Sequence, residues 1–469
     1  MAVGRTSRSR SIRAPGTCPT GSRRHAPTAR GRACDQPRNV RRLAQTVGGG
    51  RLLAHPHLGA GGRRSTPSES GEVDRLPPGR DDGCRAWKTG PVTDWIDAVL
   101  DTSLVRGAAE LEQTDRGLLI HRLPAHARAL ADPQLAMVEE QPAGVRVAFR
   151  TRADRVVMTA HRTTVEFAGV PPRPDSAYDV VVDGELIERI ASTGGDRRVL
   201  DPSIGGVETH DGPATVLDIK LSSGEHDVEI WLPHYERLEL IGLRADAPVQ
   251  PLPPRTTWLH YGSSVSQGSN AIHPTDSWPV VSARAAGVDL VNLGFGGSAL
   301  LDPFVARVMR DTPADVVSVE LGINIVNADL MRRRAFGPAV DGFLDTIRDG
   351  HPDAPLLVVS SVYCPIHEKT PGPGAFDPEE FAVGRLAFQA TGDPEEVAAG
   401  RLTLEVVRED LRRIVDRRRA DDPHIAYLDG LELFGPVDHE REPLPDRLHP
   451  TAAAHRLIGA RFADHGLSR

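Results

Sequence analysis

Residues 115–246 alternate between apolar and polar side chains. In 145–150 and again in 228–232, a large apolar residue occupies every second position, the period typical of half-buried strands. Asp183-Gly184, between two apolar runs, predicts a two-residue hairpin turn, and Ser223-Gly224 gives a weaker signal of the same kind. Short strands at this spacing predict an all-β sandwich or jelly roll over residues 92–248.

A proline-rich stretch, residues 249–254, predicts a stiff linker, and the pattern then changes. Strand-like apolar runs alternate with helical segments, the runs lying at residues 257–261, 290–293, 316–321, 355–360 and 425–428. This alternation predicts an α/β fold over residues 255–469, with a parallel sheet covered by helices on both faces. In such folds ligands bind at the carboxyl ends of the strands, so the chemistry is expected there.

One helix is predicted in more detail. Residues 393–396, Asp-Pro-Glu-Glu, have the form of a helix start, with an N-cap carboxylate, proline at the first helical position and an acid three residues after the cap. Apolar residues at 404, 407, 411 and 414 then follow at helical spacing, which places one stripe against the sheet. We therefore expect a helix that begins at Asp393.

Residues 1–90 differ from the rest of the chain in composition. They hold 18 basic and 6 acidic residues, a formal net charge of +12, whereas residues 91–469 carry −20. With no Phe or Tyr, the segment buries too little surface to offset its ordering entropy, so residues 1–91 are predicted to be a disordered Arg/Gly/Pro-rich tail. We hypothesise that the native start lies near Val92, because this composition is typical of GC-rich DNA outside a reading frame. An organelle transit peptide is the alternative.

Several function classes are excluded or disfavoured. No run of about 18 apolar residues exists, so we expect no membrane insertion, and without a recognisable signal peptide the expected location is the cytoplasm. A folded part this acidic gives no reason to expect nucleic acid as a partner. His367-Glu368 begins like the zinc motif H-E-x-x-H, but Pro371 stands where the second histidine belongs, so the pair is interpreted as solvated loop residues. We expect no metal and no cofactor.

Two candidate motifs follow the first two α/β strands. Ser264 lies in a Gly/Ser-rich stretch, residues 262–268, where a strand-to-helix turn would expose a nucleophile, although the α/β-hydrolase pattern G-x-S-x-G fails at Ser266. Gly294, Gly296 and Ala299 match the dinucleotide fingerprint G-x-G-x-x-A. That reading is disfavoured, because the fingerprint belongs in the first βα turn and Asp315, the acid about 20 residues on, lies at the start of the next strand rather than at its end. Two interpretations of this motif remain: a tight turn with no role in the reaction, or a glycine whose N–H approaches a reacting oxygen.

Two further motifs lie later in the chain. Asn324 follows Gly322 after the third strand, where its amide either donates to an oxyanion or makes a loop hydrogen bond. Asp446 precedes His449 by three residues, a spacing that lets the carboxylate orient the imidazole. Four such features in this order are far less expected by chance than any one of them.

With these motifs, residues 255–469 resemble a GDSL-type esterase of the SGNH hydrolase superfamily, which has a flavodoxin-like α/β fold. The resemblance implies that Ser264 is the nucleophile, that Asp446 and His449 complete a catalytic triad, and that Ser264, Gly297 and Asn324 form the oxyanion hole. A preceding all-β domain resembles the arrangement in some carbohydrate acetyl esterases and in an acyltransferase of polyketide tailoring.

Two positions depart from the family pattern. Ser263 replaces the first-block Asp, and Ile325 replaces the Asp that often follows the third-block Asn. Neither belongs to the triad, so we expect activity to persist. We also expect the Pro/Gly-rich segment 364–378 to overhang the site and to shape acyl or alcohol specificity.

The resemblance implies acyl transfer through a covalent serine intermediate. We expect a serine ester hydrolase acting on a small-molecule or carbohydrate ester. If an acceptor alcohol reaches the acyl-enzyme before water, the same site is an acyltransferase. The alternative from another functional class is an inert glycan-binding module. The oligomeric state stays open.

Overall fold

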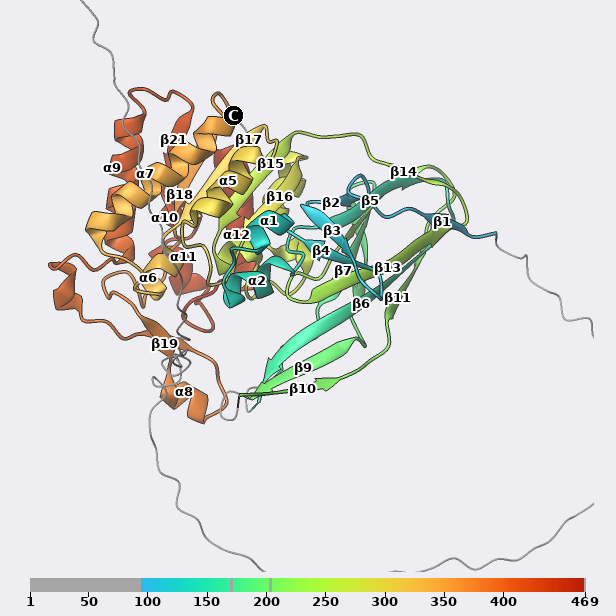
Figure 1. Ribbon diagram of the computed structural model, residues 1–469, viewed down its shortest axis with the longest axis horizontal. Coiled ribbons are helices and arrows are strands. Elements are labelled where there is room, and N and C mark those ends of the chain that lie inside the picture. Colours follow the sequence, from blue (N-terminus) through green and yellow to red (C-terminus); the bar gives the residue numbers. More distant parts are fainter. Residues whose placement is uncertain (1–93, 169–171, 202–204, 468–469) are drawn as a thin grey trace, which may run out of the picture. The chain divides into compact units, whose positions relative to one another are not determined.

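The computed structural model describes residues 94–168, 172–201 and 205–467 (Figure 1). The predicted tail, residues 1–91, and the hypothesised start near Val92 lie outside this part of the chain. The described residues form a β domain, which comes first in the chain, and an α/β domain. None of the helices in these ranges is long and apolar enough to cross a membrane.

The β domain is built from two sheets. The first holds β1 (Ile96–Ala98), β3 (Glu110–Gln113), β4 (Leu118–His121), β6 (Arg155–Phe167), β9 (Asp196–Asp201), β10 (Gly206–His210), β11 (Thr215–Lys220) and β13 (Arg237–Ala245). The second holds β2 (Val105–Arg106), β5 (Arg146–Thr151), β7 (Ala177–Val182), β8 (Glu185–Ala191), β12 (His226–Trp231) and β14 (Val249–Pro251). Side chains of both sheets, such as Phe149 and Met158, share one core, which is the expected sandwich.

The turn predictions for this domain have different outcomes. Asp183-Gly184 joins β7 to β8 with positive φ angles of 50° and 87°, as a two-residue hairpin requires. The weaker prediction at Ser223-Gly224 is wrong, because β11 and β12 on either side of it lie in different sheets. Strand β5 is buried on both faces rather than one, since Arg146 on its second face pairs with Asp289 of the α/β domain.

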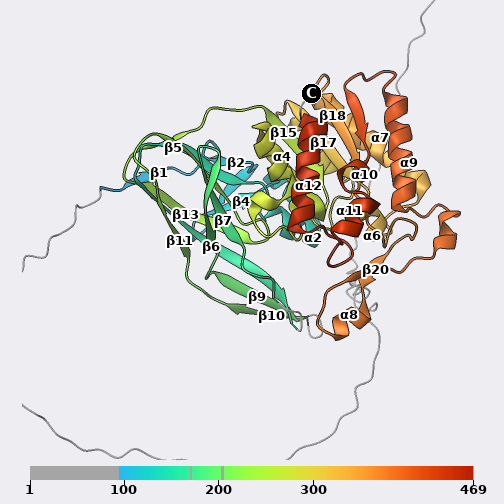
Figure 2. The same cartoon turned by 180° about the vertical axis from the view of Figure 1, so that it is seen from behind.

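Two short helices inside the β-domain sequence leave the sandwich. Helices α1 (Ala125–Arg128) and α2 (Pro133–Glu139) follow β4, and both views of the molecule place them beside the α/β domain (Figures 1 and 2). Their buried residues, including Leu135 and Val138, belong to the same core cluster as Phe295 and Val305 of that domain. The segment between β4 and β5, residues 122–145, which we call the early segment, therefore completes the α/β core.

The α/β domain contains a five-stranded parallel sheet in the order β16-β15-β17-β18-β21. Its strands are β15 (Thr257–Gly262), β16 (Asp289–Gly294), β17 (Val316–Leu321), β18 (Leu356–Ser360) and β21 (Ile425–Leu428). By position in the chain this order is 2-1-3-4-5, the flavodoxin-like arrangement, and all five predicted strands are present.

Helices cover both faces of this sheet. The domain's helices are α3 (Ser264–Gln267), α4 (Trp278–Ala286), α5 (Pro303–Asp311), α6 (Ile323–Asn327), α7 (Arg333–Gly350), α8 (Pro378–Ala382), α9 (Leu404–Arg418), α10 (Gly430–Leu433), α11 (Pro436–Arg441) and α12 (Ala452–Phe462). Apolar side chains of α5, α7 and α9 pack on one face, and those of α4, α10 and α12 pack on the other. A small hairpin, β19 (Gly374–Phe376) and β20 (Phe388–Ala390), lies outside the sheet.

Two local expectations are corrected. The helix predicted to begin at Asp393 is split: Asp393 caps only the 3-10 turn Pro394–Val397, and α9 begins separately, with the Thr403 hydroxyl accepting from the N–H of Val406. The predicted linker is partly a strand, because Val249–Pro251 pairs with β5. The apolar stripe at 404, 407, 411 and 414 is buried as expected.

Candidate active site

Three of the predicted site residues follow neighbouring strands of the parallel sheet. Ser264 is the first residue of α3, directly after β15; Gly297 lies in the turn after β16, and Asn324 lies in α6 after β17. Because parallel strands end at the same edge, these residues meet at the carboxyl edge of the sheet. Strand β15 lies between the other two, so Ser264 is central.

The structure brings Ser264, His449 and Asp446 together. The Nε2 atom of His449 lies 3.0 Å from Ser264 Oγ, and its Nδ1 atom lies 2.8 Å from Asp446 Oδ2. The other carboxylate oxygen of Asp446 accepts backbone N–H groups from Leu448 at 3.0 Å and His449 at 2.7 Å. The short loop before α12 therefore folds around its own carboxylate.

The charge of Asp446 fixes the roles of the two imidazole nitrogens. Burial raises its pKa, but the hydrogen bonds and charge of His449 and the Leu448 N–H outweigh burial and lower the pKa to about 2. An ionised carboxylate only accepts hydrogen bonds, so His449 Nδ1 donates to it. In the neutral ring, Nε2 then carries the lone pair that faces the Ser264 hydroxyl.

A further residue, Asn270, holds Asp446 from the other side. Its Nδ2 atom donates to Asp446 Oδ2 at 3.1 Å and lies 3.5 Å from the carbonyl oxygen of His449. Asn270 has a left-handed backbone, with φ of 67°, which asparagine tolerates better than most residues. No sequence signal marks Asn270, because a lone Asn after a Gly/Ser-rich turn carries no distinctive pattern.

Three possible oxyanion donors surround Ser264. The N–H of Ser264 lies in the first turn of α3, where no intrahelical acceptor exists. Asn324 is 6% exposed and its Oδ1 accepts from the N–H of Ala299 at 3.1 Å, so the amide Nδ2 is left to donate. Among the described residues, neither this Nδ2 nor the N–H of Gly297 has a hydrogen-bond acceptor.

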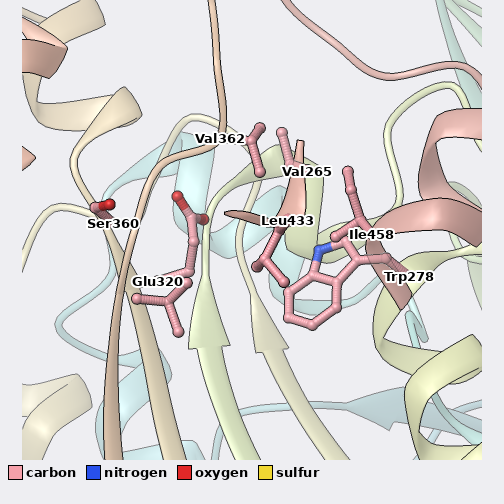
Figure 3. Close-up of a pocket in the computed structure, with 8 residues that line it drawn as sticks. Val265, Trp278, Glu320, Ser360, Val362, Leu433 and Ile458 are labelled. Carbon is pink, nitrogen blue, oxygen red and sulfur yellow. The ribbon is translucent and has the colours of Figure 1, made fainter. Parts of the chain in front are cut away.

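Buried polar groups hold the turn between β15 and α3, which carries Ser264, in place. Glu320 accepts the N–H of Ser263 and the hydroxyl of Ser361, both at 2.9 Å, and Ser361 in turn accepts the N–H of Ile323 at 2.8 Å. Glu320 thus joins the start of α3 to the start of α6. Figure 3 shows its carboxylate near an apolar pocket whose lining includes Val265; neither Ser264 nor His449 lines that pocket.

A buried histidine completes this support. His260 lies 2.8 Å from Ser266 Oγ through Nε2 and 2.7 Å from Ser318 Oγ through Nδ1. Burial lowers its pKa to about 3, so the ring is neutral. It is a packing and hydrogen-bonding residue of the sheet rather than an acid or base.

The two departures from the family pattern have local explanations. The Ser263 hydroxyl accepts from the N–H of Val265 at 3.3 Å and caps α3, a task that serine and aspartate both perform. Ile325 is fully buried in the core of the α/β domain. Neither residue leaves an unfilled role in the hydrogen bonds around Ser264.

The segment expected to overhang the site does contact it, and the contacts extend farther along the chain than predicted. The N–H of Phe388 donates to the carbonyl of Asp446 at 2.9 Å, and its ring meets the His449 ring edge-on, with centroids 5.6 Å apart. Arg447 pairs with Asp377 at 2.7 Å and Glu380 at 3.1 Å. Cys364 Sγ also lies 3.6 Å from the carbonyl oxygen of Arg447, so the predicted segment 364–378 contacts the His449 loop at both of its ends, and Glu380 and Phe388 extend the contact.

The interpretation of His367 and Glu368 as solvated is wrong. Glu368 pairs with Arg408 at 2.6 Å, and His367 is fully buried. Among the described residues, His121, Glu139 and Glu140 form the one group with metal-ligand spacing. Their atoms already have partners: His121 Nδ1 lies 2.7 Å from Glu139, and Glu140 pairs with Arg237 at 3.0 Å. We therefore interpret the group as a structural ion-pair cluster.

The glycines of the dinucleotide-like motif also have a packing role. A methyl group on Gly294 would lie 2.5 Å from the backbone nitrogen of Gln267, so only glycine lets the end of β16 lie against α3. Gly296 lies beside Ser264, because a methyl group there would lie 3.6 Å from the Cβ of Ser264.

Both domains match known families. Residues 257–367 match the model of the GDSL-like lipase/acylhydrolase family, and residues 104–241 match that of the SsfX3 N-terminal domain. Asp446 and His449 lie beyond the first match. The search of curated proteins returned no match.

Several solved structures align with most of this chain. A salicylyl-acyltransferase, SsfX3, from a tetracycline biosynthetic pathway aligns with a TM-score of 0.62 and 26% identity, covering 76% of this chain and 92% of that one. A GDSL-like lipase from Bacteroides ovatus aligns with a TM-score of 0.53 and 18% identity, covering 78% and 95%. A family two carbohydrate esterase from Clostridium thermocellum has a TM-score of 0.46 and 13% identity, covering 69% and 91%.

Proposed function

Because the chain belongs to the GDSL-type SGNH hydrolases that carry an N-terminal β domain, we propose that it is a serine esterase that works through an acyl-enzyme. The observation that carries the proposal is the hydrogen-bonded series Ser264, His449 and Asp446 at the carboxyl edge of the sheet. An inert glycan-binding module gives no physical reason to keep this series beside three free donors.

The proposed mechanism follows from these atoms. His449 Nε2 takes the Ser264 proton as Oγ attacks the ester carbonyl, and Asp446 stabilises the resulting imidazolium. The donors on Ser264, Gly297 and Asn324 bind the oxyanion. When the tetrahedral intermediate collapses, His449 protonates the leaving alcohol. The ring then activates water, which attacks the acyl group and releases the acid and free Ser264.

Hydrolysis of p-nitrophenyl acetate tests this proposal. Ser264→Ala is expected to lower kcat by roughly 10⁴-fold or more, because no other group can form the acyl-enzyme. Ser223→Ala, which removes an exposed hydroxyl of the β domain, is the matched control and should keep wild-type rates. A fluorophosphonate should add to the wild type once, at Ser264. Turnover that survives Ser264→Ala would rule out the proposal.

A second candidate, an acyltransferase, is favoured by one observation. Both domains align with the salicylyl-acyltransferase, at 26% identity over 92% of that chain, and the β domain matches the N-terminal model named after it. The same acyl-enzyme would then pass its acyl group to an alcohol. Adding acceptor alcohols to the p-nitrophenyl ester assay separates the two: an acyltransferase forms new ester at the expense of free acid, whereas a hydrolase forms only acid.

A further inference from the structure

The end of β16, directly before the loop that carries Gly297, is held by a buried arginine of the early segment. Arg122, which follows β4, is 1% exposed. Its Nη1 donates to the carbonyl oxygens of Asn292 at 3.0 Å and Gly294 at 2.6 Å, and its Nη2 donates to that of Val138 at 2.5 Å. Burying a guanidinium on carbonyl groups is costly, and desolvation lowers the pKa of Arg122 to about 9.

Both backbone groups of Gly296 are also fixed. Gln134 of α2 donates from Nε2 to the Gly296 carbonyl at 3.0 Å, and Gln267 of α3 accepts the Gly296 N–H at 2.7 Å. The side chain of Gln267 is itself held, because its Nε2 donates to Gln141 at 2.5 Å. Gly296 thus has one contact from the nucleophile helix and one from the early segment.

The early segment that provides these contacts is itself held by packing and by hydrogen bonds. Its apolar residues, including Leu123 and Leu135, lie in the α/β core. Glu139 of α2 accepts the backbone N–H groups of Arg122 and Leu123, both at 3.2 Å. Arg122 and Gln134 therefore lie on a segment that is packed into the α/β core, and the guanidinium of Arg122 also stacks on the Phe295 ring at 4.8 Å.

The geometry of the peptide bond links Gln134 to the oxyanion donor. The carbonyl of Gly296 and the N–H of Gly297 belong to one planar trans peptide and point in opposite directions. A hydrogen bond that fixes the Gly296 carbonyl therefore also fixes the direction of the Gly297 N–H. Gly297 needs such a restraint, because its φ of 74° is open to glycine but is only one of many conformations glycine can adopt.

We propose that Arg122 and Gln134 are positioning residues that hold the Gly297 N–H in place for the oxyanion. The segment between β4 and β5 is then part of the catalytic machinery, even though it precedes the α/β domain in the chain. This inference rests on the proposed function, because it assigns a task in the same acyl-transfer step.

The test compares Gln134→Ala with Gln113→Ala. Both glutamines are exposed and donate to backbone carbonyls, but Gln113 bonds to its own turn, at Thr114 and Gly117. The assay measures kcat and KM with p-nitrophenyl acetate, the inhibition constant of a boronic acid that forms a tetrahedral adduct on Ser264, and Tm. Gln134→Ala should lower kcat and weaken boronic acid binding by a similar factor, about 5-fold to 10-fold. KM and Tm should not change. Gln113→Ala should change none of the four.

Arg122→Lys provides a second arm. Lysine keeps the charge but cannot hold two carbonyls with one planar group, so we expect a larger loss of kcat than with Gln134→Ala. Unchanged kcat and boronic acid binding in Gln134→Ala, or a rise in KM alone, would overturn the inference while the esterase stands. A wild type without Ser264-dependent turnover would overturn the proposed function and the inference together.

Discussion

The two loops on either side of Ser264 are held in different ways. The loop with Gly297 is held by Gln267 of its own domain and also by a segment more than 150 residues earlier in the chain, because Gln134 contacts Gly296 and Arg122 contacts the end of β16 before the loop. The loop with Asp446 and His449 is held by its own domain, through Asn270, the backbone of Phe388 and ion pairs of Arg447.

The difference matches the tasks proposed for the two loops. An oxyanion donor has to stay in one place while charge develops on the substrate, which favours rigid contacts such as those of the buried Arg122. The imidazole must serve first the serine and then the leaving group, and its loop is held partly by exposed ion pairs. The side chain of Arg447 is 42% exposed, and such pairs contribute at most about 1 kcal/mol. The support on the histidine side is therefore the weaker one.

After Ser264→Ala, the largest expected effect tests the oxyanion side. Asn324→Ala removes the side-chain donor and also the acceptor for the N–H of Ala299. We expect kcat for p-nitrophenyl acetate to fall by roughly 10²-fold to 10³-fold with little change in KM, because the amide acts on the charge of the transition state.

Asn327→Ala is the matched control. It lies in the same helix, but its Oδ1 lies 3.1 Å from Nε2 of His367 rather than facing Ser264. Wild-type kcat in this variant, with the loss confined to Asn324→Ala, would support the assignment. Equal losses in both variants would mean that α6 is only structurally sensitive.

The sequence was sufficient wherever the signal is local. The five parallel strands are short apolar runs, and Ser264, Asn324 and His449 each lie in a motif of a few residues. The strands and these three residues could therefore be placed without a structure. The oxyanion roles assigned to Gly297 and Asn324 rest on the family resemblance and remain predictions.

The supports of these residues could not be predicted, because they join distant parts of the chain. Arg122 and Gln134 are ordinary polar residues until the fold brings them to Gly294 and Gly296. The burial of His367 depends in the same way on distant partners. The helix expected from Asp393 failed for a local reason: Thr403 is itself a capping residue and begins a new helix.

A second prediction concerns how the histidine side is held at low pH. His455 of α12 has Nε2 2.8 Å from the carbonyl of Ser269, next to Asn270. Burial lowers its pKa to about 4, against about 6.5 in an unfolded chain. As the pH falls below 6.5, the unfolded chain binds a proton that the folded protein does not. The free energy of unfolding therefore falls, by about 2 kcal/mol at pH 5 from this residue.

Urea unfolding at pH 7 and pH 5 measures this contribution. His455→Gln keeps an N–H for the Ser269 carbonyl but removes the titrating ring, so its loss of stability between the two pH values should be about 2 kcal/mol smaller than in the wild type. His260, whose pKa burial alone lowers to about 3, contributes equally in both proteins, and His234, whose pKa burial and then the charge of His455 lower to about 3, stays neutral at both pH values. An identical pH dependence in the wild type and in His455→Gln would show that His455 binds its second proton in the folded protein as readily as in the unfolded chain.

The smallest expected effect isolates the hydrogen bond from Asn270 to Asp446. Asn270→Gly suits the left-handed backbone at φ of 67° and removes only the side chain. Asp446 keeps its two backbone donors, so we expect kcat to fall only about 3-fold to 10-fold, which corresponds to the about 1 kcal/mol that an ordinary hydrogen bond contributes. Asp183→Gly, at φ of 50° in the β7–β8 turn, controls for the added backbone freedom. A loss as large as that of Asn324→Ala would mean that the histidine side depends on one contact and is as rigidly built as the oxyanion side.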